Sequence, residues 1–229
     1  MDPSLASLAA AAVAFVGSHF LLSHPLRAGL VRGLGEKGFL GLYSLVALAT
    51  FAWLVIAFRA APPYGTPLWS GYDEVSWTIA SLLTIVALVL FLGSLRGNPA
   101  LPDPRAAKGL ASKEPHGVFR VTRHPMMWGF ALWAIAHILI APTFRTLVLA
   151  GAILVLALVG AHLQDRKKAT LMGAGWAAWQ ARTRYWPRWS QLPDAGLGLW
   201  ALALVLWLAI TWAHVWLAYV PAGIWRWVA

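Results

Sequence analysis

The sequence contains no cysteine and few acidic residues, and each absence excludes a class of chemistry. Without cysteine, the chain forms no disulfide, holds no metal through a thiolate and has no cysteine nucleophile. It has eight Asp and Glu against eighteen Lys and Arg, for a formal net charge of +10. All eight acids lie at the ends of apolar runs or between them. We therefore expect no paired-carboxylate catalysis within a membrane.

Charge of either sign is scarce, at 11% of 229 residues, whereas 60% are hydrophobic and the mean hydropathy is +0.67. Soluble domains average about 25% charged and about 45–50% apolar residues. Disordered chains carry far less apolar material than this one. The composition therefore excludes both classes and predicts an integral membrane protein.

Long apolar runs predict an all-α bundle of about six transmembrane helices in a single domain. The expected spans are roughly 4–24, 39–60, 77–95, 126–142, 145–164 and 197–220. The first run lacks the cationic start of a signal peptide, so we interpret it as a retained helix.

Basic residues predict the orientation of these spans. Fifteen of the eighteen Lys and Arg lie in the segments 25–38, 96–125 and 165–196, which alternate with segments that hold few. The positive-inside rule then places these three segments in the cytoplasm and both termini outside it. The basic side would contact the anionic headgroups of the lipid bilayer. No nucleic-acid-binding motif is present, so we expect no nucleic-acid partner.

One basic segment, 171–189, also carries four tryptophans. We interpret it as a partly helical piece that lies on the inner membrane surface. The alternative, a solvated loop, would leave those four indole rings in water.

Four of the seven histidines fall within predicted spans: His19, His137, His162 and His214. At helical rise, His19 lies roughly 9 Å and His137 roughly 16 Å from the inner ends of their spans. Helix tilt can absorb that difference. Two facing imidazoles can ligate a haem iron. Each could equally form one structural hydrogen bond, and Ser23 is a local candidate partner for His19. A zinc site is disfavoured, because no third close ligand is evident.

Arg123 and His124 immediately precede Pro125, at the inner start of the fourth span. An Arg-His pair at the headgroup boundary suits a phosphate or carboxylate, including a haem propionate. An interfacial lipid anchor is an equal alternative.

These residues fall in three blocks that together resemble the NnrU family of bacterial membrane proteins, from His19 to about Trp189. The first block is 19–27 with 32–38 and Tyr43-Ser44, the second is 122–129 with 132–137, and the third is 165–167 followed by Trp176. The resemblance implies a multi-pass protein of the bacterial inner membrane, associated with nitrogen-oxide metabolism and denitrification.

Zeta-carotene isomerases are similar to this family, and the similarity implies haem b as cofactor. Their haem-ligating histidines match His19 and His137 here. Their cysteine, three residues before the second histidine, is replaced by Ala134, so a switch of ligand from histidine to cysteine is not possible. The implied function is haem-dependent redox or isomerase chemistry, with a hydrophobic molecule or nitric oxide as ligand.

A remoter similarity links 117–129 to isoprenylcysteine and phospholipid methyltransferases, in which this segment helps bind S-adenosylmethionine. Leu171, Gly175, Trp179 and Arg184 fit part of a later motif of those enzymes, but 165–167 replaces its glutamate pair. A membrane methyltransferase is therefore an alternative function, and a non-catalytic membrane assembly factor is a third.

Overall fold

The structure, a computed structural model, describes residues 2–62, 66–101 and 109–228, and these residues form helices and loops without a strand. Six helices are long: α1 (Pro3–Ser23), α2 (Arg27–Ala60), α3 (Glu74–Gly93), α6 (Pro125–Ile140), α7 (Phe144–Met172) and α9 (Leu197–Leu217). The short elements are α5 (Val118–Val121), α8 (Ala174–Arg182), the 3-10 helix η1 (Trp189–Ala195) and α10 (Trp225–Val228).

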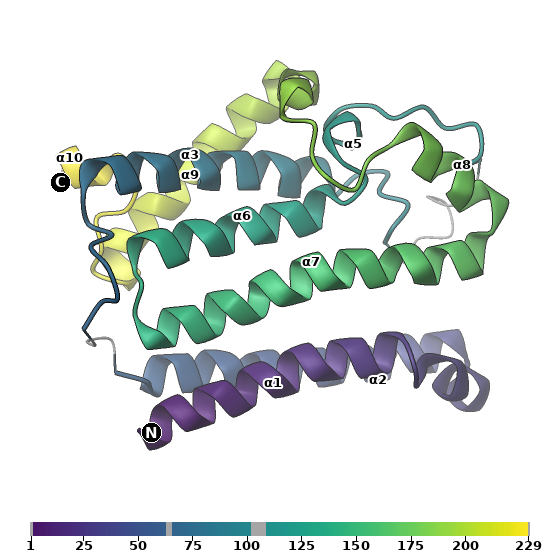
Figure 1. Ribbon diagram of the computed structural model, residues 1–229, viewed down its shortest axis with the longest axis horizontal. Helices are drawn as coiled ribbons and strands as arrows, with labels where there is room; N and C mark the ends of the chain where they lie inside the picture. The colour runs from purple at the N-terminus through teal and green to yellow at the C-terminus, as the bar shows by residue number, and fades with distance from the viewer. Residues whose placement is uncertain (1, 63–65, 102–108, 229) are drawn as a thin grey trace.

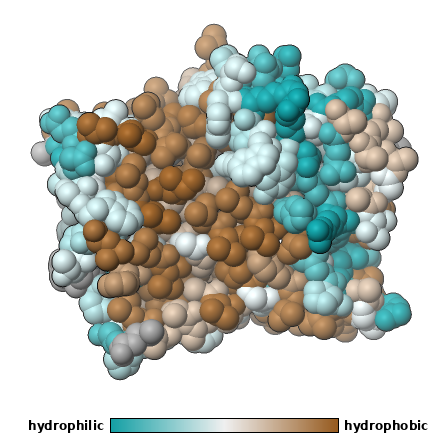
Figure 2. All heavy atoms as spheres, in the orientation of Figure 1, coloured by the Kyte–Doolittle hydropathy of each residue, from teal (hydrophilic) through white to brown (hydrophobic). Residues whose placement is uncertain are grey.

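Five of these helices, α1, α2, α3, α7 and α9, are long and apolar enough to cross a membrane. The fourth predicted span, 126–142, forms the remaining long helix, α6, which is apolar but only 16 residues long. At helical rise it covers about 24 Å, which is less than the about 30 Å of a bilayer core. The prediction of a polytopic helical membrane bundle is confirmed, and Figure 2 shows the broad apolar surface of these helices.

The helices lie side by side in a fixed order. Helix α7 packs against α1 on one side and α6 on the other; α2 packs on α1, and α3 lies between α6 and α9 (Figure 1). Both chain termini lie at one end of the bundle, which we call the terminal end. Helices α1, α3 and α7 finish at the opposite end, which we call the basic end. The termini therefore share one side, as the alternation of basic segments predicts.

Helix starts follow local chemistry. The Asp2 carboxylate accepts a hydrogen bond from the Ser4 backbone N–H at 2.8 Å, and that of Asp73 accepts one from Ser76 at 2.9 Å. Such caps satisfy backbone donors that a helix leaves unpaired. Pro125 occupies the first turn of α6, where its missing N–H costs nothing.

Two predicted loop boundaries are wrong. Helix α2 begins at Arg27 rather than 39 and bends at Gly35, whose φ of 71° favours glycine. Helix α7 runs past residue 164 to Met172. Hydropathy identifies only the apolar part of each helix, so it does not detect a helix that continues into charged sequence. Arg105 and Lys108, counted in the predicted basic segment, lie outside the described residues.

Candidate functional site

A buried ionic cluster joins the start of α6 to the charged end of α7. The Arg123 Nε donates to both Asp165 carboxylate oxygens, at 2.9 and 3.0 Å, and its Nη2 also donates to Oδ2. The Nε2 of His124 lies 2.8 Å from Asp165 Oδ1. The side chain of Arg123 is 12% exposed, that of His124 is 0% exposed and that of Asp165 is 10% exposed. We call this group the Arg-His-Asp cluster.

The sequence does not single out Asp165 as a site residue, although this single carboxylate leaves the prediction of no paired-carboxylate catalysis unaffected. The sequence places this residue at the edge of an apolar run, and only the fold brings it to Arg123 and His124. The same contact bears on the predicted propionate site. Arg123 Nε and Nη2 and His124 Nε2, which could bind a propionate, are already bonded to the carboxylate of Asp165.

The loop after α8 holds the cluster in place. The backbone N–H of Arg123 donates to the Arg184 carbonyl at 2.8 Å, and that of Arg188 donates to the Val121 carbonyl at 2.9 Å. The Thr122 hydroxyl donates to the Tyr185 carbonyl at 2.7 Å. These bonds pair 121–123 with 184–188, so the two segments of the remote methyltransferase similarity do meet.

Tyr185 covers one side of the cluster. Its hydroxyl donates to the Leu158 carbonyl at 2.6 Å, and the Arg123 guanidinium lies 5.7 Å from its ring centroid. Burial raises the pKa of Tyr185 above its usual value, and the nearby carboxylate of Asp165 raises it further. The phenol therefore stays neutral and keeps its donated bond at physiological pH.

Three buried polar atoms beside the cluster have no hydrogen-bond partner within the described part of the chain. They are His124 Nδ1, Trp176 Nε1 and Trp179 Nε1. The predicted surface segment is partly helical, as expected, but α8 turns two of its tryptophans into the protein. Only Trp186 and Trp189 remain exposed, at 68% and 46%. The sequence could not tell these two pairs apart.

His19 and His137, the predicted haem ligands, do not come together. His19 lies four residues before the end of α1, near the basic end, whereas His137 lies three residues before the end of α6, near the terminal end. Phe20 faces Gly160 of α7, and the short turn between α6 and α7 brings His137 level with about residue 147. The intervening stretch of α7, at 1.5 Å per residue, places the two histidines roughly 20 Å apart along the bundle axis. Helix α7 also lies between their helices. One iron cannot bind both side chains in this arrangement.

Each of these histidines, like His214, is held in one tautomer by the carbonyl four residues before it. His19 Nδ1 lies 2.7 Å from the Phe15 carbonyl, and His137 Nδ1 lies 2.8 Å from the Trp133 carbonyl. A carbonyl oxygen only accepts, so Nδ1 carries the proton and Nε2 keeps its lone pair. The partner of His19 is thus Phe15 rather than the predicted Ser23. Among the described residues, no group of three or more His, Asp or Glu forms a metal site.

His19 lies in a row of rings that continues to Phe15 on one side and leads to basic side chains on the other. Its ring centroid is 5.5 Å from that of Tyr43, which is 6.0 Å from that of Phe39. The Arg27 guanidinium lies 5.3 Å from the Phe39 centroid. This row connects a histidine within the apolar bundle to the basic end.

Four cationic or titratable side chains gather where α1 and α2 meet the end of α7: His24, Arg27, Lys167 and Lys168. We call them the basic cluster. Arg27 repels both lysines electrostatically and pairs with Glu36 at 3.0 Å. Burial lowers the pKa of His24 below its usual value, and the positive charge of Lys167 lowers it further. The cluster thus has an excess of positive charge.

The fold and the buried ionic cluster define a polytopic helical membrane protein with a polar network at one end of the bundle. Comparison with family models identifies it further: the model described as NnrU protein matches residues 7–222. The chain therefore belongs to the NnrU family, as the motif blocks predict. No curated protein and no solved structure matches it.

Proposed function

We propose that this NnrU-family protein binds one haem b, with His19 as the single axial ligand. The observation that carries the proposal is the hydrogen bond of His19 Nδ1 to the Phe15 carbonyl. It leaves the lone pair of Nε2 available to a metal inside the apolar part of the bundle. Histidines that ligate metals are commonly held by such a bond at their other nitrogen. The distance between His19 and His137 argues against a bis-histidine site.

The basic cluster favours His19 over His137. Haem b carries two propionates, which need cations or hydrogen-bond donors. Arg27, Lys167 and Lys168 supply positive charge at the end of the ring row that starts at His19. They are better suited to this role than Arg123 and His124, which are bonded to Asp165. His137 lies near the opposite end of the bundle.

A single axial histidine suits the nitrogen-oxide association of the family. Haem held in this way has an open coordination position at which a diatomic gas such as nitric oxide can bind. The residues of this chain would bind and orient the group: His19 at the iron, and the basic cluster at the propionates. Redox or isomerase chemistry on a hydrophobic molecule is the other role that the open position would permit, with Ala134 excluding a thiolate ligand.

The test is the absorption spectrum of the full chain, purified after expression with haem supplied. We expect a high-spin, five-coordinate b-type spectrum that His19→Ala abolishes and His137→Ala leaves unchanged. Arg27→Gln with Lys167→Gln should weaken haem retention without changing the spin state. A low-spin bis-histidine spectrum, lost in either histidine variant, would refute the single-ligand assignment. Colourless wild-type protein would refute haem binding itself.

The contact between 121–123 and 184–188 favours methyl transfer as a second candidate, because it joins the two segments that the methyltransferase similarity requires. Asp165 is the acidic residue beside this contact, but its carboxylate is already paired with Arg123 and His124. We therefore expect calorimetric titration with S-adenosylmethionine to detect no binding. Micromolar affinity would favour the methyltransferase over the haem protein.

A further inference from the structure

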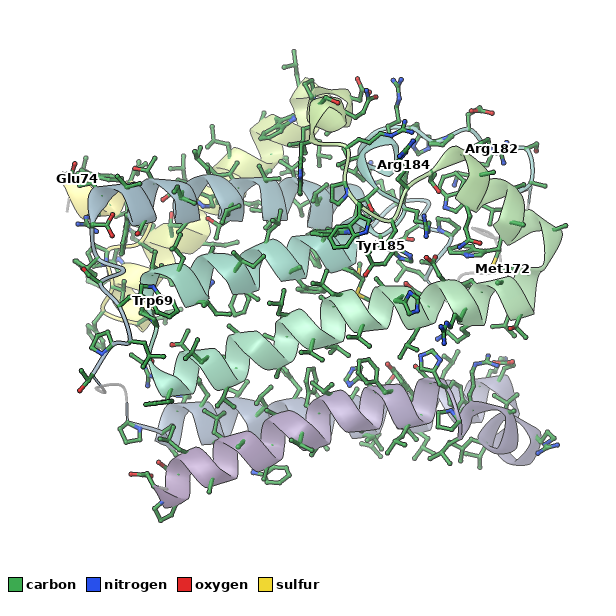
Figure 3. All side chains as sticks on the ribbon, in the orientation of Figure 1. Trp69, Glu74, Met172, Arg182, Arg184 and Tyr185 are labelled. Carbon is green, nitrogen blue, oxygen red and sulfur yellow. The ribbon has the colours of Figure 1, made fainter. Side chains whose placement is uncertain are left out.

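The loop that pairs with 121–123 also forms one wall of a pocket at the basic end. The pocket has a volume of about 370 Å³ and is lined by Arg123, Ala181, 183–186 and Arg188. Figure 3 shows Arg184 and Tyr185 at this end, far from Trp69 and Glu74 at the terminal end. Two backbone hydrogen bonds and the Thr122 hydroxyl fix the loop, so the pocket walls are preformed.

Charge distinguishes this pocket from its surroundings. Three neighbouring arginines have carboxylate partners: Arg120 with Asp194 at 3.0 Å, Arg123 with Asp165, and Arg182 with Glu114 at 3.5 Å. Arg184 and Arg188 form no ion pair with any described residue, and no acidic side chain is among the described lining residues. The pocket therefore holds two uncompensated positive charges.

Aromatic residues place the pocket at the membrane boundary. Trp186 lines it and is 68% exposed, and Trp189 on the same loop is 46% exposed. Both rings pack on Trp128, at centroid distances of 5.3 and 6.1 Å. Tryptophan with one apolar and one exposed side favours the level of the lipid headgroups. Figure 2 shows polar residues gathered toward this end, beside the apolar surface of the helices.

We infer that this pocket binds a phosphate group through Arg184 and Arg188. Two guanidinium groups offer forked donors that match phosphate oxygens. The preformed loop reduces the entropy lost on binding. The phosphate belongs either to the headgroup of an anionic phospholipid or to a soluble phosphate compound. This site is separate from the haem proposal, which depends on His19 and the basic cluster.

The test is native mass spectrometry of the full chain with phosphatidylglycerol, with phosphatidylcholine as neutral reference. We expect wild-type protein to bind the anionic lipid about tenfold more tightly, as two charge-assisted contacts allow. The variant Arg184→Gln with Arg188→Gln should lose this preference. The control, Arg32→Gln with Arg96→Gln, removes the same charge from exposed positions outside the pocket and should keep it.

Inorganic phosphate separates the two sources. If millimolar phosphate displaces the lipid from wild-type protein, the pocket binds a soluble phosphate group; if it does not, the lipid headgroup is the ligand. The melting temperature in phosphatidylcholine should be the same for both double variants and the wild type, because the side chains of Arg184 and Arg188 form no ion pair with any residue that the structure describes. Equal loss of lipid preference in both double variants, or no preference in wild-type protein, would overturn the inference.

Discussion

The α1–α2 pair and the body formed by α3, α6, α7 and α9 are packed differently. In the body, seven of the 16 residues of α6 are buried, and Gly129 lets α6 approach α3 so closely that a Cβ there would lie 2.8 Å from the Ala87 carbonyl oxygen. Helices α1 and α2 each bury three residues, as α9 of the body also does, so α6 is the most deeply buried helix by this measure. The apolar cluster of the α1–α2 pair, which includes Leu8 and Leu54, is separate from that of the body.

The polar groups of the two regions differ in the same way. The body encloses the Arg-His-Asp cluster, in which every charge has a partner. The α1–α2 pair carries His19 together with His24 and Arg27, and the other half of the basic cluster, Lys167 and Lys168, lies at the end of α7. The body thus encloses a paired ionic cluster, whereas positive charges in excess gather at the boundary of α1 and α2 with α7.

The largest expected effect is on the ionic cluster of the body. Asp165→Ala leaves Arg123 and His124 buried without an acceptor, which should lower the free energy of unfolding by about 3–5 kcal/mol. Glu36→Ala removes the ion pair of the α1–α2 region, in which the glutamate side chain is 62% exposed, and should cost about 0–1 kcal/mol. Unfolding by SDS titration, followed by circular dichroism, measures both. Equal losses would mean that the regions do not differ.

Helix packing should give the next largest difference. Gly129→Ala places a methyl group against the backbone of α3, and overpacking of this kind costs about 1–3 kcal/mol. Gly160→Ala, where α7 meets α1, would bring a Cβ only to 3.8 Å from Phe20, an ordinary contact. Its effect should stay within about 0.5 kcal/mol. The same SDS titration compares them, and a costly Gly160→Ala would show that α1 packs as tightly as the body.

A smaller difference is expected between two tyrosines. Tyr185→Phe removes the hydroxyl that donates to the Leu158 carbonyl and should cost about 1 kcal/mol. Tyr43 contacts His19 through its ring, and no hydrogen bond of its hydroxyl is present within the described residues. Tyr43→Phe should leave thermal stability unchanged. A larger loss from Tyr43→Phe than from Tyr185→Phe would contradict the assignment of polar stabilisation to the body.

Hydropathy and charge predicted the class of fold because they depend on local sequence. Apolar runs marked the six long helices, and the basic segments correctly placed both termini at one end. Features set by tertiary contact could not be predicted. The gap between His19 and His137 depends on where α6 starts relative to α1. Hydropathy did not reveal that α7 continues to Met172.

Asp165 is the clearest example of a site residue that could not be predicted from the sequence. It lies 42 residues from Arg123, so no local pattern connects the two. The only available signal was the third motif block, which contains Asp165 beside Arg166 and Lys167. Tryptophans show the same limit: Trp176 and Trp179 belong to the segment predicted to lie on the membrane surface, yet both are buried in the protein.

The distance between residues 19 and 137 tests the central claim most directly, namely that the two candidate haem ligands belong to different parts of the molecule. Because the chain has no cysteine, His19→Cys with His137→Cys places spin labels at these two sites alone. Pulsed electron paramagnetic resonance should then give a separation of about 20 Å or more, as helical rise and the intervening α7 require. A much shorter separation, seen as strong dipolar broadening of the continuous-wave spectrum, would bring both side chains to one site and contradict the single-ligand account.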